Sequence, residues 1–95
     1  MKFNWKNKKV LVTGGASFIG SNLVDRLVAL GATVRIVDDL SSGKRGNIVV
    51  HLKKKSIQFI KGDLREQKIA RKSLKNIELV VHLAGDHGGR GYIDL

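Results

Sequence analysis

Short apolar runs alternate along this chain with stretches in which apolar residues recur at helical spacing. Each run holds four to six residues, mostly Val, Ile and Leu, as expected of a strand that is buried on both faces. The predicted strands are 9–13, 33–38, 57–60 and 79–83. Because strands that alternate with helices usually form a parallel sheet, the pattern predicts an α/β fold.

Three helices are predicted between these strands, at 18–30, 46–55 and 65–75. The first has a wide apolar stripe and stops before Gly31, a residue that suits the position after a helix. The second is weakly patterned. The residues expected on the buried faces are Ile19, Leu23, Val24, Leu27 and Val28 in the first helix, Ile48, Val49 and Leu52 in the second, and Ile69 and Leu74 in the third.

A glycine-rich turn joins the first strand to the first helix in the stretch V-L-V-T-G-G-A-S-F-I-G, residues 10–20. A turn without bulky side chains exposes the free N–H groups and positive dipole end of the helix, which together bind phosphate. The spacing is Gly14-x-x-Ser17-x-x-Gly20, which differs from the Rossmann pattern G-x-G-x-x-G. Ser17 suits a helix N-cap and also offers a hydroxyl to phosphate, so both roles stay open. The stretch predicts a dinucleotide-binding, Rossmann-type three-layer fold with the partial strand order 3-2-1-4.

Asp38 ends the second predicted strand, about 20 residues beyond the glycine turn. An acid at this point accepts hydrogen bonds from a ribose diol and repels a 2′-phosphate, so it favours NAD over NADP. The alternative for Asp38 and Asp39 is an ordinary turn at a strand end. The cations Arg35, Lys44 and Arg45 leave open the binding of a 2′-phosphate.

Composition excludes several kinds of site. The 95 residues include no cysteine, so neither a disulfide nor a thiolate metal site is available, and three scattered histidines do not make a metal site. No apolar run approaches the roughly 18 residues that a membrane helix needs. We therefore expect a cytoplasmic protein that binds neither metal nor membrane.

Positive charge is concentrated in residues 44–75. This basic block holds eleven Lys and Arg against two acids, and so carries nine of the ten net positive charges of the chain. It either attracts nucleic acid or another polyphosphate, or is a solvated surface. Phe59 is its only aromatic residue on which a base could stack, so a nucleic-acid partner is not favoured.

Several motifs in order resemble those of the extended short-chain dehydrogenase/reductases, the NAD-dependent epimerase/dehydratase family. Residues 13–20 resemble the family's T-G-x-x-G-x-x-G turn, with Ser17 in place of the middle glycine. The loop D-L-S-S-G at 39–43 is similar to that of UDP-glucose 4-epimerase-like proteins, and G-D-L at 62–64 and H-L-A-G at 82–85 resemble two further family motifs. Residues 84–93 resemble the A-A-D-M-G-G-M-G-F-I segment of GDP-mannose 3,5-epimerases, with His87 and Arg90 in place of two methionines.

The resemblance implies NAD as cofactor and a nucleotide sugar as substrate. The implied cofactor-binding residues are Gly14, Ser17, Phe18, Ile19, Gly20, Asp38, Asp39, Leu40, Ser41, Ser42, Gly43, Asp63, Leu64, Leu83, Ala84 and Gly85. Gly88 and Gly89 are implied to line the substrate side of the cleft. The family motif places Asp63 at the adenine, and Asp63 also suits the cap of the next helix, with Glu66 completing a capping box. His82 is expected to be a packed, hydrogen-bonded residue rather than a catalyst.

The family's catalytic Tyr-x-x-x-Lys is expected beyond Leu95, because Tyr92 has no lysine at that spacing. Residues 1–95 are therefore interpreted as the N-terminal NAD-binding portion of a nucleotide-sugar epimerase or dehydratase that acts by transient hydride transfer, and as inactive alone. The fourth strand is expected to be a sheet edge open to self-association. The alternatives are a stand-alone nucleotide- or RNA-binding module that uses the basic block, and an NAD-binding redox sensor.

Overall fold

The computed structural model describes residues 4–40, 45–53 and 56–83. Within them, four strands form one sheet: β1 (Lys9–Thr13), β2 (Thr33–Asp38), β3 (Ile57–Lys61) and β4 (Leu79–His82). The sheet has the order β3-β2-β1-β4, and its three neighbouring pairs are parallel. The predicted α/β class and strand order are confirmed.

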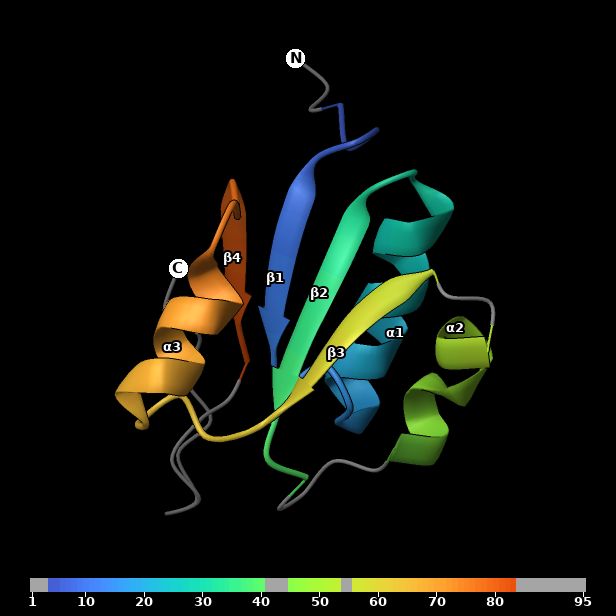
Figure 1. Cartoon of the computed structure of the whole chain (residues 1–95). Helices are drawn as coiled ribbons and strands as arrows, with labels where there is room; N and C mark the ends of the chain where they lie inside the picture. The colour runs from blue at the N-terminus through green and yellow to red at the C-terminus, as the bar shows by residue number, and fades with distance from the viewer. Residues whose placement is uncertain (1–3, 41–44, 54–55, 84–95) are drawn as a thin grey trace.

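Helices cover both faces of this sheet (Figure 1). α1 (Phe18–Ala29), the 3-10 helix η1 (Arg45–Ile48) and α2 (Val49–Lys53) lie on one face, and α3 (Gln67–Leu74) lies on the other. The second predicted helix is thus split into two short pieces. Among the described residues, none of the helices could span a bilayer, since even the longest of them, α1, has only 12 residues.

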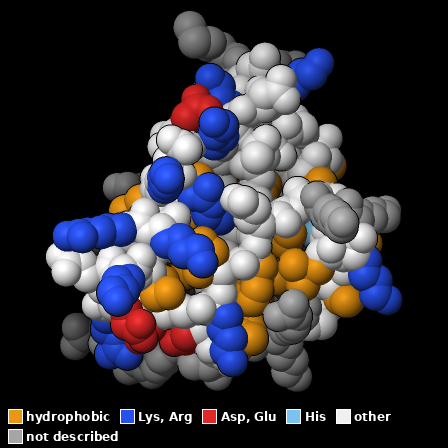
Figure 2. Space-filling view, in the orientation of Figure 1, with side chains coloured by type: hydrophobic (Ala, Val, Ile, Leu, Met, Phe, Trp, Pro, Cys, Tyr) orange, Lys and Arg blue, Asp and Glu red, His pale blue; other side chains and the backbone are white. Residues whose placement is uncertain are grey.

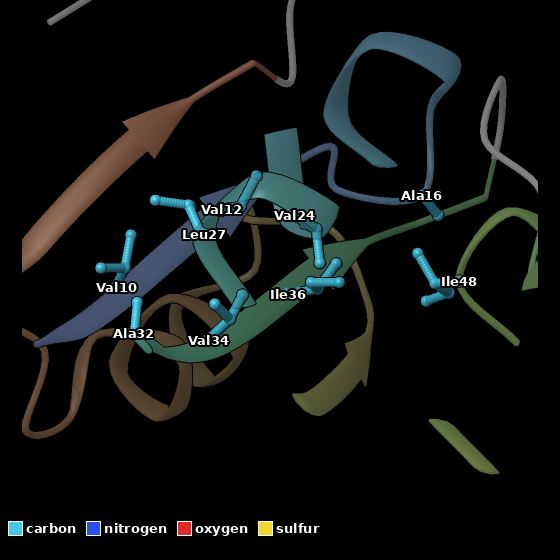
Figure 3. Close-up of a cluster of buried hydrophobic side chains, with 9 residues drawn as sticks. All are labelled: Val10, Val12, Ala16, Val24, Leu27, Ala32, Val34, Ile36 and Ile48. Atoms are coloured by element: carbon cyan, nitrogen blue, oxygen red, sulfur yellow. The ribbon is translucent and has the colours of Figure 1, made fainter. Parts of the chain in front are cut away.

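The main hydrophobic core lies between α1 and the sheet. Successive strand side chains point to opposite faces, so alternate residues of β1 and β2 meet α1 and η1 (Figure 3). The buried cluster consists of Val10, Val12, Ala16, Val24, Leu27, Ala32, Val34, Ile36 and Ile48. A fully buried Val, Leu or Ile side chain contributes roughly 1.5–3 kcal/mol, so this layer is the main source of stability.

Three apolar residues expected in the core are instead exposed. Ile19 lies in the first turn of α1, next to the glycine turn, and Val49 begins α2 facing outward. In α3, the residue on the face of half-buried Ile69 is Ser73, four positions later, which is fully buried. Leu74 is rotated about 140° from Ile69 and is half exposed. The predictions for Val49 and Leu74 were wrong because short helices with few apolar residues define their rotation poorly. The prediction for Ile19 was wrong because this residue lies in the first turn of α1, beside the glycine turn, where its side chain is largely exposed.

Local hydrogen bonds define both ends of α1. The Ser17 hydroxyl oxygen accepts from the Gly20 N–H at 3.0 Å, so the predicted N-cap is confirmed. At the other end, Gly31 has a φ of 87°, and it and the next residue donate to carbonyls of the last turn. These paired bonds form a Schellman cap, so Gly31 ends the helix as predicted.

Candidate dinucleotide-binding site

The candidate site lies at the carboxyl ends of β1, β2 and β4. The chain passes from β1 to β2 on one side and reaches β4 on the other side only after β3, so the strand order reverses at β1. Ligands of open α/β sheets bind at such a switch point. The glycine turn and Asp38 both lie at this edge of the sheet.

Three glycines allow the turn to pack closely against its surroundings. Gly14 has a φ of 72°, which side chains disfavour, and its N–H donates to the Val37 carbonyl at 2.8 Å. A Cβ at Gly20 would collide with the Gly14 carbonyl oxygen. A Cβ at Gly15 would lie 2.6 Å from the Ile36 side chain, a contact that sequence reasoning missed. The turn therefore has no room for side chains on its inner side.

The first turn of α1 presents two open backbone donors. In the part of the chain that the structure describes, the N–H groups of Phe18 and Ile19 donate to no protein acceptor, and their side chains are largely exposed. Ser17 is occupied within the turn, because its hydroxyl also donates to the Gly14 carbonyl at 2.8 Å. The two amides stand at the positive end of a helix of 12 residues, an arrangement that suits a phosphate.

Asp38 directs its carboxylate back toward this turn. Its Oδ2 accepts from the Ala16 N–H at 3.0 Å and its Oδ1 accepts from the Leu40 N–H at 2.7 Å, while only 7% of the residue is exposed. Each carboxylate oxygen has two lone pairs, so both can accept one further hydrogen bond. Asp39 is exposed, and Leu40 packs against the core. The acid thus lies beside the glycine turn at the switch point.

Arg35 lies away from the site, on the face of the sheet that carries α3. Its Nη1 donates to the carbonyls of Ser73 at 2.9 Å and Lys75 at 2.7 Å, and its Nε donates to Gln58 at 2.9 Å. The guanidinium therefore satisfies the C-terminal end of α3. Arg35 was wrongly considered as a partner for a 2′-phosphate.

Asp63 and Leu64 follow β3, and Leu64 is half-buried. Asp63 pairs with the Arg65 guanidinium and accepts from the Arg65 N–H at 2.8 Å. These bonds, the side-chain bond first, lower the pKa of Asp63 below its usual value of 3.8. The predicted capping box is wrong, because α3 begins after Glu66, whose side chain makes no cap hydrogen bond. The G-D-L motif includes Gly62, but the sequence did not predict its close packing, in which a Cβ would lie 2.8 Å from Ile69.

The end of β4 is tied to the end of β1 through one hydroxyl. The Thr13 Oγ1 accepts from the Leu83 N–H at 2.9 Å and lies 2.7 Å from the His82 Nδ1. His82 is half-buried and hydrogen-bonded, as expected from the sequence. Together with a bond from the same Leu83 N–H to the Thr13 carbonyl at 3.1 Å, the hydroxyl bond fixes the main chain at Leu83, just after the carboxyl end of β4.

Several predicted site residues lie outside the described residues. They are Ser41, Ser42, Gly43, Ala84, Gly85, Gly88 and Gly89. The same holds for Lys44 and the side chain of Arg45, the other two cations considered for a 2′-phosphate. Among the described residues, no group of three or more His, Cys, Asp or Glu is placed to hold a metal ion.

The fold and the glycine turn define the class of protein: a nucleotide-binding α/β domain, with a candidate site at the switch point of its parallel sheet. Residues 10–93 match the model of the NAD dependent epimerase/dehydratase family. The chain belongs to this family.

Individual relatives agree with this assignment. The chain is 39% identical over 79 residues to UDP-glucuronic acid decarboxylase 2 of Arabidopsis thaliana, covering 83% of this chain and 17% of that protein. It is 41% identical over 83 residues to UDP-glucose 4-epimerase of Neisseria meningitidis serogroup B, covering 82% of this chain and 24% of that protein. The structure of the Bordetella bronchiseptica enzyme WbmF in complex with NAD+ superimposes with a TM-score of 0.78 at 34% sequence identity. The match covers 90% of this chain and 26% of that enzyme. The chain thus spans about a quarter or less of the length of these relatives.

Proposed function

We propose that residues 1–95 are the N-terminal NAD-binding portion of a nucleotide-sugar epimerase or dehydratase. The observation that carries the proposal is the placement of Asp38 beside the open end of α1, which puts an acceptor for the adenosine ribose next to donors for the pyrophosphate. The complex of the relative WbmF with NAD+ supports the choice of cofactor.

Each part of the site has a role in this proposal. Bound NAD supplies a nicotinamide ring that accepts and returns a hydride. The amides of Phe18 and Ile19 would bind the pyrophosphate, Gly14 and Gly20 would allow the tight turn that presents these amides, and Asp38 would accept from the ribose hydroxyls. The remaining proposed cofactor contacts are Ser17, Asp39, Leu40, Ser41, Ser42, Gly43, Asp63, Leu64, Leu83, Ala84 and Gly85, and the proposed sugar contacts are Gly88 and Gly89.

The catalytic groups and the substrate domain are proposed to belong to the remainder of a longer protein, because the chain covers only a small part of each relative. No residue of the chain is assigned a catalytic role. We therefore propose that the 95 residues bind the cofactor and are inactive alone. Their cytoplasmic location stays a prediction from the sequence.

Calorimetric titration with NAD+ and NADP+ tests the proposal. We expect NAD+ to bind at least tenfold more tightly than NADP+, because the 2′-phosphate would meet the Asp38 carboxylate. Asp38→Asn should weaken NAD+ binding and narrow the difference between the two cofactors. Glu66→Gln removes an acid whose side chain makes no cap bond at the start of α3, and it should leave both affinities unchanged. Equal binding of NADP+ and NAD+ by the unmodified chain would refute the assignment of Asp38.

Polyanion binding is the second candidate function, and the exposed side of α3 favours it. Figure 2 shows Lys and Arg side chains gathered over this helix. Lys68, Arg71, Lys72 and Lys75 are all exposed, and within the described residues none of them forms an ion pair. Phe59, however, is half-buried against the core and presents no open ring to a base. Binding of a short RNA that collapses between low and high salt would support this candidate.

Self-association through β4 is a further part of the proposal. β4 pairs with β1 on one side, and no described strand pairs with its other side. An open edge of this kind presents unpaired N–H and C=O groups to another chain.

A further inference from the structure

The segment that follows the loop after β2 returns to the glycine turn and docks on it. In η1, the Asn47 side-chain amide donates from Nδ2 to the Ala16 carbonyl oxygen at 2.7 Å. The next residue, Ile48, is fully buried in the same core cluster as Ala16, and Figure 3 shows the two side chains near each other. The chain is therefore anchored on the turn at Asp38 and again at Asn47.

These two anchors hold Ala16 from both sides. Its N–H donates to the Asp38 carboxylate at 3.0 Å, and its carbonyl accepts from Asn47. The carbonyl of Ala16 and the N–H of Ser17 belong to one planar peptide group, and that N–H donates to the Gly14 carbonyl at 3.1 Å. Because both poles of the group are bonded, its orientation is fixed.

The fixed peptide group directly precedes the open amides of α1. If the Asn47 bond were lost, the Ala16 carbonyl would have no side-chain donor. It could then rotate toward the proposed phosphate position at the N–H groups of Phe18 and Ile19. A carbonyl oxygen facing a phosphate repels it, whereas an N–H group attracts it. The direction of this one carbonyl thus bears on anion binding.

We propose that Asn47 is a positioning residue for the pyrophosphate: it holds the Ala16 carbonyl away from the anion and keeps the amides of Phe18 and Ile19 facing it. The inference rests on the proposed function, since it deepens the role of the same site. Asn47 itself does not touch the pyrophosphate.

Two substitutions test the proposal, with affinities for NAD+, ADP and adenosine measured by NMR titration of the chain. Asn47→Asp keeps the shape of the side chain but replaces its donor with an acceptor, and Asn47→Ala removes the donor without adding charge. We expect both substitutions to weaken the affinity for NAD+ and ADP by fivefold to thirtyfold. The affinity for adenosine, which lacks phosphate, should change by less than twofold. Asn76→Asp is the matched control: it adds the same negative charge as Asn47→Asp, but at a residue after α3. Its φ of 61° is one that Asp also tolerates, and the substitution should change none of the three affinities.

The outcomes separate the two proposals. If the unmodified chain binds neither NAD+ nor ADP, the proposed function fails before Asn47 is tested. If the unmodified chain binds both and the Asn47 variants bind equally well, or lose adenosine to the same extent, the positioning role is overturned.

A measurement on the unmodified chain covers the case of a variant that does not fold. ADP should shift the amide resonances of Phe18 and Ile19 strongly. Those of Ala16 and Ser17 should move little, because both N–H groups already donate within the protein. Larger shifts at Ala16 and Ser17 than at Phe18 and Ile19 would contradict the proposal.

Discussion

Asp38 shows how one side chain serves both the fold and the proposed site. Its carboxylate holds the N–H groups of Ala16 and Leu40, so it fixes the turn before α1 and the chain after β2 together. An acid is suited to this position because it offers about four acceptor sites, of which the backbone uses two. Loss of the charge should therefore disturb the geometry of the turn as well as the recognition of a ribose.

At Ser73, neither the proposed function nor the packing explains why a hydroxyl group is present. Its hydroxyl is fully buried and, among the described residues, has no hydrogen-bond partner. A buried polar group without a partner costs about 1–3 kcal/mol, and alanine is the better helix former. We expect Ser73→Ala to raise the free energy of unfolding by about 1 kcal/mol in urea denaturation. A loss of stability would show that the hydroxyl is in fact bonded in solution.

The Asp63–Arg65 pair should have a measurable titration. Because the pKa of Asp63 is lowered in the folded chain, the pair stabilises the fold above pH 3.8, and this contribution is lost as the pH falls through the lowered pKa. Carbon-detected NMR should place the Asp63 midpoint below 3.8, and Arg65→Gln should move it upward. Arg71→Gln, at another exposed arginine, should leave the midpoint unchanged. A midpoint that ignores Arg65→Gln would contradict the pairing.

At the scale of elements, α3 depends on a neighbour for its stability. The helix carries several like charges at spacings of three and four residues, which destabilise an isolated helix. Arg35, from β2, compensates by donating to carbonyls at its C-terminal end. The sheet thus supports α3 through hydrogen bonds, in addition to the limited apolar packing of Ile69.

Arg35→Met tests this support while keeping most of the side-chain stem. We expect a loss of about 1–2 kcal/mol in the free energy of unfolding, since the carbonyls of Ser73 and Lys75 lose a charged donor. Arg71→Met removes the same charge from α3 itself, where no ion pair is lost, and should cost much less. Equal losses of stability in the two variants would mean that removing any positive charge destabilises the fold, and that the hydrogen bonds of Arg35 to the end of α3 are not the cause.

Elements differ in how well the sequence predicts them, for physical reasons. The four strands were predicted to within one residue because each is a short run in which most residues are apolar. The signal is strongest in β1 and β2, which are buried along most of their length, whereas β3 and β4 are partly exposed. α1 was predicted well because caps at Ser17 and Gly31 act locally. In α3, only two large apolar residues, Ile69 and Leu74, mark eight helical positions, and the rotation was wrong at Leu74.

The same distinction applies to the candidate site. The glycine turn and Asp38 could be found because strand, turn and helix are adjacent in sequence. The contacts of Asn47, Gly15 and Gly62 could not be found, since their partners lie elsewhere in the chain: the Ala16 carbonyl, the Ile36 side chain and the Ile69 side chain. No local pattern of residues reports such contacts.

At the scale of the whole molecule, the proposed self-association depends on the side of β4 that pairs with no described strand. We expect sedimentation velocity to show self-association that increases with protein concentration. Val80, in the middle of β4, is 43% exposed, and Val80→Lys should shift the chain toward monomer because a charged residue blocks edge pairing. Val50→Lys, at an exposed valine of α2, is the matched control and should not. A monomer at every concentration would rule out pairing through this edge.

The pairing of β1 with β4 also has a kinetic consequence. Val10 lies opposite Leu79, so their contact closes a loop of almost 70 residues, whereas β1 and β2 are joined by a single helix. Loop closure costs more entropy as the loop grows, and topologies rich in distant contacts cross their barriers more slowly. The docking of β4 should therefore limit the refolding rate. Until β4 docks, the backbone N–H and C=O groups on that side of β1 have no partner strand.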